Sequence, residues 1–292
     1  MKDNNSIKIA ILEKFIHLSP HSNTSALKSV PTHDKESNVK IGKFPEMLQA
    51  PEKSSVMGLP IHLSNDYSAW LRSRLQEKQG THVVTLNSEM VMLAQRDPTL
   101  ASAIAKADLI VPDGSGVVLY FRLRGRKQQR SPGIELAESL LHSVGQLDEP
   151  ASVYFYGAKP GVVESAAEEW QKRVPGIDIT TTHGYISSEQ EEELKQKLIE
   201  QQPSVIFVAL GVPRQELWII DNRHLCPEAI WMGVGGSFDI WAGIKDRAPL
   251  WMQQNHLEWL YRLYQEPWRW RRMLLLPQFA IRGVWSAIIG QQ

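Results

Sequence analysis

One carboxylate stands out among the residues of this sequence that could do chemistry. Asp113 lies between Pro112, which has no N–H to donate, and Gly114, which has no side chain to shield it. The apolar run DLIV, of the kind that forms a buried strand, ends just before this carboxylate. A carboxylate at a strand end can take the proton from a bound hydroxyl as a general base, a role that contributes about 10²–10⁴ in rate. Asp is also a favoured N-cap, so capping of a helix that starts near Ser115 is an equal alternative.

Other polar side chains follow two further apolar runs. Thr85 and Asn87 come at and after the end of HVVTL, where they could orient sugar hydroxyls or simply cap a helix over 88–95. Gln215 opens a helix after VALGVP, where it could donate to a substrate oxygen or lie in solvent. Taken singly, each residue is also explained by ordinary turn chemistry.

Short β-rich runs alternating with helical segments must position these residues. The runs are HVVTL (82–86), DLIV (108–111), SVYFY (152–156), IDITTT (177–182), SVIFVAL (204–210) and AIWMGV (229–234). Alternation of this kind predicts βαβ units. Apolar residues at successive strand positions predict a Rossmann-like α/β fold, with a mainly parallel sheet covered by helices on both faces. Ligands of such sheets lie at the carboxyl ends of the strands, which is where the polar residues fall.

Glycine-rich loops follow several of these strands, as in PDGSG, GAKPG and GVGGS. Helix N-termini behind such loops suit a phosphate group. The nicotinamide and P-loop classes are nevertheless unlike this chain: Phe238 stands where the dinucleotide fingerprint needs its last glycine, and no G-x-x-x-x-G-K-[ST] occurs. The sequence also holds no Asp-x-Asp and no H-E-x-x-H. We therefore expect no metal site, and expect arginines and backbone amides to meet a diphosphate.

Composition bounds the remaining classes. The 292 residues are 42% hydrophobic, and 32 Lys and Arg balance 32 Asp and Glu, so nucleic-acid binding is not indicated. A single cysteine, Cys226, excludes an internal disulfide and favours the cytosol. The longest apolar run near the N-terminus, Ile9 to Leu12, is too short for a secretory signal. Residues 1–55 are rich in Ser, Asn, Lys and Pro and predict a poorly ordered extension before an α/β core over 56–248.

Residues 249–292 form a basic segment rich in tryptophan and predict a helical appendage. From Arg262 onward there are five arginines (262, 269, 271, 272 and 282) against one acid, Glu266. Arginine mixed with indoles and aliphatic side chains is typical of contact with an anionic membrane surface. A membrane span over 273–289 is disfavoured because Pro277, Gln278 and Arg282 interrupt it. A core helix pair with a solvated arginine face is the other alternative.

Seven motifs in order resemble those of the WecG/TagA/CpsF family of bacterial glycosyltransferases, from about Gly58 to Arg272. They are VTLNSEM, ADLIVPDGSGVV, FYGAKPGV, HGYI, VALGVPRQE, GVGGSFDIWAG and RAPLWMQQNHLEWLYRLYQEPWRWRRM. One element departs from the family pattern: its Arg-x-x-Gly-x-Asp is Arg130-Ser-Pro-Gly133-Ile-Glu135 here, with a longer acid at the end.

The resemblance implies an inverting transferase that needs no cofactor or divalent metal. It would move an N-acetylmannosamine-type sugar from UDP to the 4-hydroxyl of GlcNAc-diphospho-undecaprenol at the cytoplasmic face of the plasma membrane, and it would assemble with copies of itself. The same chemistry with glucose or N-acetylmannosaminuronic acid is an alternative, as is a non-catalytic scaffold that binds nucleotide sugars. The resemblance implies that Asp113 is the catalytic base. It also implies that the substrate is positioned by Thr85, Asn87 and Gln215, and that the diphosphate is bound by Arg262, Arg269 and Arg272.

Overall fold

The computed structural model describes residues 50–147 and 151–289, with side chains as far as residue 285. Strands β1 (Glu52–Val56) and β2 (Leu59–Leu63) form an antiparallel hairpin closed by Met57 and Gly58, both with positive φ (48° and 83°). This hairpin begins at Glu52, before residue 56, where the core was expected to start. EKSSV has almost no apolar signal, and its strand is held by backbone pairing and by this two-residue turn. The rest of the expected extension, residues 1–49, lies outside the described residues.

A six-stranded parallel sheet forms the centre of the fold, in the order β4-β3-β8-β7-β5-β6. The strands are β3 (Thr81–Leu86), β4 (Leu109–Pro112), β5 (Ser152–Gly157), β6 (Asp178–Thr182), β7 (Val205–Ala209) and β8 (Ile230–Gly233). Each of the six strands predicted from the sequence is present, and the sheet is wholly parallel.

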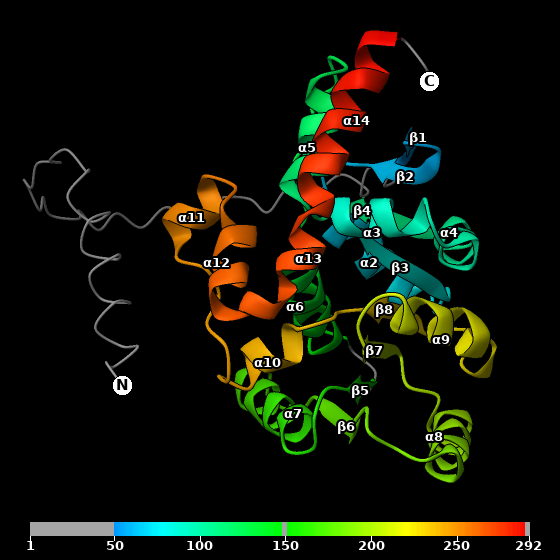
Figure 1. The fold of residues 1–292 in the computed structure, drawn as a ribbon. Coiled ribbons are helices and arrows are strands. Elements are labelled where there is room, and N and C mark those ends of the chain that lie inside the picture. Colours follow the sequence, from blue (N-terminus) through cyan, green and yellow to red (C-terminus); the bar gives the residue numbers. More distant parts are fainter. Residues whose placement is uncertain (1–49, 148–150, 290–292) are drawn as a thin grey trace, which may run out of the picture. The chain divides into compact units, whose positions relative to one another are not determined.

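Helices cover both faces of this sheet, as predicted (Figure 1). On one face lie α2 (Tyr67–Gln76), α6 (Gly133–Val144), α7 (Val162–Arg173) and α10 (Ser237–Trp241). On the other face lie α3 (Ser88–Ala94), α4 (Pro98–Ala105), α5 (Ser115–Arg122), α8 (Ser188–Gln201) and α9 (Arg214–Asn222), which the short 3₁₀ turn η1 (Arg223–Leu225) follows.

Side-chain alternation along the strands explains how both faces become core. In β5, Val153 and Phe155 pack against α7 and α10, whereas Tyr154 and Tyr156 pack with α8 and α9 on the opposite face. All four side chains are at most 3% exposed. Burial on both faces is the reason that these strands have apolar residues at successive positions.

The C-terminal segment is helical, as expected, and packs on the core. It comprises α11 (Leu250–Gln254), α12 (Glu258–Gln265), η2 (Pro267–Arg269), α13 (Trp270–Met273) and α14 (Leu275–Ile289). Helix α14, red in Figure 1, runs beside α5 and α3, and its Leu275 and Phe279 are buried in the same cluster as residues of those helices. Among the described residues, no helix combines the length and apolar character that crossing a membrane requires.

Candidate active site

A cavity of about 750 Å³ lies at the carboxyl ends of the strands. Loops after β3, β4, β5, β7 and β8 form its floor, and residues of α12, η2 and α13 form the facing wall. The structure brings all of the site residues expected from the sequence to this one cavity: Thr85, Asn87, Asp113, Gln215, Arg262, Arg269 and Arg272.

Asp113 follows β4 and does not cap the next helix. The N-cap of α5 is Gly114, with no side-chain hydrogen bond, so the capping alternative is wrong. Instead, Asp113 Oδ1 accepts a hydrogen bond of 3.1 Å from the backbone N–H of Gly133, at the start of α6. Burial raises the pKa of Asp113 above its usual value, although the Gly133 N–H and the charges of Arg262 and Arg130 oppose the rise. A carboxylate with a raised pKa is a stronger base than a solvated one, which suits proton abstraction.

The hydrogen bond to Asp113 depends on a close approach between Thr85 and Gly133. A Cβ atom on Gly133 would lie 2.9 Å from Thr85 Cγ2 and 3.1 Å from its hydroxyl oxygen. Thr85 is 9% exposed at the end of β3. The glycine therefore allows α6 to begin against this strand, with its first N–H reaching the carboxylate.

Asn87 performs the capping role that the sequence left open. Its Oδ1 accepts a 3.0 Å hydrogen bond from Met90 N and so caps α3, while the residue also borders the cavity. Asp97 caps α4 in the same way, followed by Pro98 in the first turn. Capping holds the Asn87 oxygen and so fixes the orientation of its amide group at the edge of the cavity.

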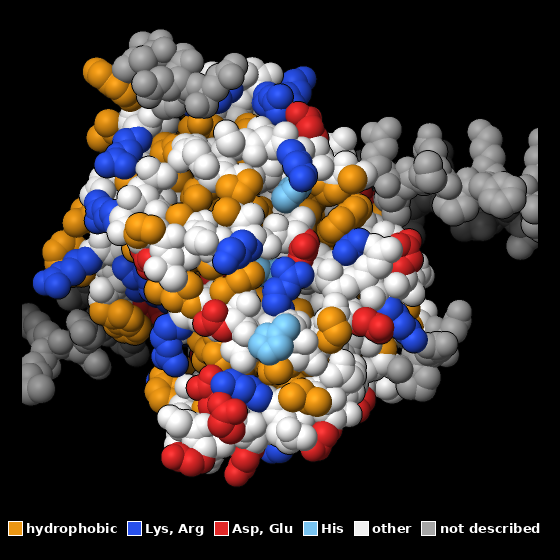
Figure 2. Space-filling view, turned by 90° about the vertical axis from the view of Figure 1, so that its right-hand side faces the viewer, with side chains coloured by type: hydrophobic (Ala, Val, Ile, Leu, Met, Phe, Trp, Pro, Cys, Tyr) orange, Lys and Arg blue, Asp and Glu red, His pale blue; other side chains and the backbone are white. Residues whose placement is uncertain are grey.

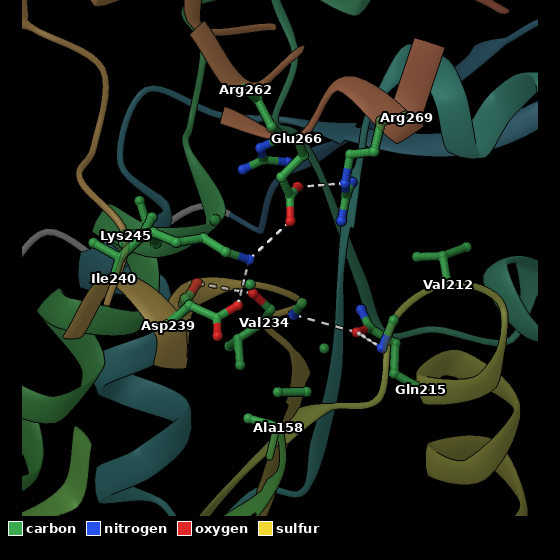
Figure 3. A pocket seen from close by; sticks show the side chains of 18 of the residues that line it. Ala158, Val212, Gln215, Val234, Asp239, Ile240, Lys245, Arg262, Glu266 and Arg269 are labelled. Carbon is green, nitrogen blue, oxygen red and sulfur yellow. Dashed lines mark hydrogen bonds and ion pairs between the residues drawn. The ribbon is translucent and has the colours of Figure 1, made fainter. Parts of the chain in front are cut away.

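Gln215 is 3% exposed and joins two loops of the cavity floor. Its Oε1 accepts 3.2 Å hydrogen bonds from Gly211 N and from Gly235 N, and its Nε2 donates to Glu216 Oε1 at 2.9 Å. Figure 3 shows the side chain reaching from α9 toward the loop after β8. The solvated alternative for this residue is therefore wrong, because three protein groups hold its amide.

Opposite charges alternate from α10 and the segment after it to the facing wall. Lys245 Nζ lies 2.8 Å from both Asp239 Oδ2 and Glu266 Oε1, and Glu266 in turn pairs with Arg269 (Figure 3). Burial would raise the pKa of Glu266, but the hydrogen bond from Lys245 and the charges of Arg269 and Arg262 hold it below its usual value. Burial, with the neighbouring arginines, lowers the pKa of Arg269. The wall thus holds several cations close together by placing carboxylates between them.

Arg272 and Arg262 complete the wall. Arg272 of α13 pairs with Glu89 of α3, which ties the C-terminal segment to the core. Among the described residues, no carboxylate is placed within ion-pair distance of Arg262, whose charge instead acts on Asp113 and Glu266. In the same part of the chain, no group of three His, Cys, Asp or Glu side chains is arranged to hold a metal ion.

Several residues of the site were not found from the sequence. The element over 130–135, which departs from the family pattern, makes two of these contacts. Glu135 pairs with Arg247, and Arg130 pairs with Glu258 of α12, which ties this element to the facing wall. Glu258 and Arg262 lie four residues apart on α12, a spacing that places them on one helix face, and Glu266 follows directly after this helix. The spacing from Arg262 was the available signal for Glu258, whereas Glu266 stood out in the sequence only as the one acid among five arginines.

Comparison with known proteins shows which family the chain belongs to. Residues 54–292 match the model of the glycosyl transferase WecG/TagA/CpsF family. Three relatives are named N-acetylglucosaminyldiphosphoundecaprenol N-acetyl-beta-D-mannosaminyltransferase. The relative from Bacillus spizizenii is 40% identical over 228 residues, 77% of this chain and 84% of its own. Those from Bacillus subtilis and Staphylococcus aureus are 37% and 36% identical, over 71% and 70% of this chain and 80% of their own. The chain therefore belongs to the WecG/TagA/CpsF family of glycosyl transferases.

Proposed function

We propose that this chain transfers an N-acetylmannosaminyl group from UDP to the 4-hydroxyl of GlcNAc carried on a polyprenyl diphosphate. The names of its relatives support the sugar and the acceptor. The observation that carries the proposal is the position of Asp113: a half-buried carboxylate, held by the Gly133 N–H, in one cavity with three arginines.

Asp113 acts as the general base in a direct displacement. As its carboxylate takes the proton of the acceptor hydroxyl, the oxygen forms a bond to the anomeric carbon of the donor. The bond from that carbon to the UDP oxygen breaks, and its electron pair leaves with UDP. Attack from the face opposite the leaving group inverts the configuration. The Gly133 N–H holds the carboxylate while the proton moves.

The cationic wall stabilises the leaving diphosphate. Negative charge develops on the departing oxygen, and Arg262, Arg269 and Arg272 border the cavity where it would collect. Preorganised cations at the position of developing charge are a large source of rate enhancement. Gln215 keeps the floor of the cavity in shape, and Thr85 and Asn87 lie within reach of sugar hydroxyls.

Contact with a membrane would bring the lipid-linked acceptor to this cavity. The C-terminal helices expose large aromatic side chains beside exposed arginines. The aromatic ones are Trp251, Trp259, Tyr264, Trp268, Trp270 and Trp285, and the arginines are 262, 271 and 282. This composition suits peripheral attachment to an anionic surface at the cytoplasmic side. On the face drawn in Figure 2, by contrast, acidic side chains gather at the lower end, where Figure 1 places α8.

A donor screen tests the proposal. The purified chain is incubated with a short-chain polyprenyl-diphosphate GlcNAc and, separately, with UDP-N-acetylmannosamine, UDP-glucose and UDP-N-acetylmannosaminuronic acid. Mass spectrometry then records the lipid product. We expect one added N-acetylmannosamine, with stoichiometric UDP. Transfer of another sugar would overturn the choice of donor, and UDP-sugar binding without any transfer would favour a scaffold.

A further inference from the structure

A buried carboxylate lies beneath the cavity floor and is not explained by the transfer reaction. Glu216, in the first turn of α9, is 0% exposed, as is His82 at the start of β3. Glu216 Oε2 lies 3.3 Å from His82 Nε2, and Glu216 Oε1 accepts a 2.9 Å hydrogen bond from Gln215 Nε2. Burial of a carboxylate is costly unless hydrogen bonds compensate for the lost water. Each oxygen of Glu216 therefore contacts one neighbouring side chain.

The chemistry of a carboxylate gives these hydrogen bonds one direction. An ionised Glu216 can only accept, so His82 donates from Nε2 and Gln215 donates from its amide nitrogen. The other ring nitrogen, His82 Nδ1, is buried without a hydrogen-bond partner, which agrees with a proton on Nε2. Because its nitrogen is committed to Glu216, the Gln215 oxygen must point the other way, toward Gly211 N and Gly235 N.

Those two N–H groups belong to the loops that follow β7 and β8. Gly211 and Gly235 both have positive φ, 75° and 52°, which glycine adopts without the penalty that other residues meet. Gly233, the last residue of β8, leaves room for the pair: a Cβ there would lie 2.4 Å from Gln215 Nε2 and 2.6 Å from Glu216 Oε1. The backbone is thus built around the Gln215–Glu216 contact.

We propose that Glu216 is a positioning residue. Its acceptor-only carboxylate fixes the orientation of the Gln215 amide, and through it the two glycine loops that line the cavity. Glu216 does not itself border the cavity, so it acts through Gln215. The inference concerns the shape of the cavity floor and holds whichever sugar the chain transfers.

Replacing Glu216 by glutamine isolates the direction of the hydrogen bonds, because the side chain keeps its size. If the new amide nitrogen faces Gln215, the Gln215 amide must turn over and present its NH₂ to two N–H donors. If the new amide nitrogen faces His82, the ring proton must move to Nδ1, where it finds no acceptor. The first arrangement takes the acceptor away from Gly211 N and Gly235 N, whereas the second leaves both loops bonded to Gln215 and costs only the His82 N–H its acceptor. Glu216→Met, which has no hydrogen-bonding oxygen at this position, removes that choice.

Hydrogen–deuterium exchange of the full chain without substrate measures the effect directly. In Glu216→Met, the Gln215 amide is no longer held by an acceptor, and we expect the amides of the loops after β7 and β8 to exchange about three- to tenfold faster as each loop loses its hydrogen bond to Gln215. Glu191→Met is the matched control. Glu191 accepts a 2.8 Å hydrogen bond from Trp218, also on α9, but does not border the cavity. Unchanged exchange in both loops of Glu216→Met, or equal acceleration in the control, would overturn the proposal.

A double variant tests the direction of these linked hydrogen bonds even if the single variant is unstable. In Gln215→Glu with Glu216→Gln, the new carboxylate accepts from Gly211 N, Gly235 N and the new amide nitrogen, and the new amide oxygen accepts from His82. All donors are satisfied again, so loop protection should return to within about twofold of the parent. Protection no better than in the single variant would refute the proposal. Because exchange is measured without turnover, this result is independent of whether the proposed transfer reaction is correct.

Discussion

Gly133→Ala should slow the reaction by disturbing Asp113, although the aspartate itself is unchanged. The added Cβ would lie 2.9 Å from Thr85 Cγ2, 3.1 Å from its hydroxyl oxygen and 3.2 Å from its Cβ, so the start of α6 must move by several tenths of an ångström. The Gly133 N–H now lies 3.1 Å from Asp113 Oδ1, near the limit for an N–H···O hydrogen bond. A small displacement therefore breaks it. A hydrogen bond to a charged group is worth about 1.5–3 kcal/mol, which corresponds to roughly ten- to hundredfold in rate.

The pH dependence of kcat/KM is the informative assay. The Gly133 hydrogen bond lowers the pKa of Asp113, so its loss should raise that pKa further and move the acid limb of the profile to higher pH. Thr85→Ser in the same chain removes the methyl group that the new Cβ meets but keeps the hydroxyl. The double variant should therefore recover part of the lost activity. An acid limb at the parent position, or a double variant as impaired as Gly133→Ala, would refute the reasoning.

Three further predictions follow from the site. The pKa of Asp113 is raised in the folded state, so ionisation of Asp113 destabilises the fold. The Tm of Asp113→Asn should therefore exceed that of the parent by an amount that grows as pH rises from about 3.9 through the raised pKa. A Tm difference that does not change with pH would contradict this. Arg262→Ala should lower kcat about 10²-fold, as measured by UDP release, whereas Arg271→Ala, which does not border the cavity, should stay near the parent. Glu266→Gln should destabilise the chain in urea by about 1–2 kcal/mol at neutral pH, because Lys245 loses a charged hydrogen bond to Glu266 but keeps Asp239 as a partner. The pKa of Glu266 is lowered, so this difference should vanish as pH falls through that pKa, and equal urea midpoints at neutral pH would exclude it.

The parts of this structure that depend on local sequence patterns were predictable. Apolar strands such as VIFVAL formed as expected. Asp113 reached the cavity for the reason seen in the sequence, because the carboxyl ends of parallel strands meet at one edge of the sheet.

The parts that depend on contacts distant in sequence were not predictable. The bond that holds Asp113 comes from Gly133, and the partner of Arg272 is Glu89, 183 residues earlier in the chain. No periodicity encodes such pairs, since they form only when separate elements pack. Strands β1 and β2 were both missed for a related reason: each is held by pairing with the other.

The rate of UDP release by Asp113→Asn tests the central claim most directly. It is measured with UDP-N-acetylmannosamine and the lipid-linked GlcNAc acceptor, beside Asp108→Asn as control. Asp108 directly precedes the first residue of β4, pairs with Arg223 and does not border the cavity. If Asp113 is the base, UDP release by its variant should be about 10²–10⁴-fold slower than by the parent, while the control keeps most of the parent rate. Release by Asp113→Asn at a rate close to that of the parent would contradict the account.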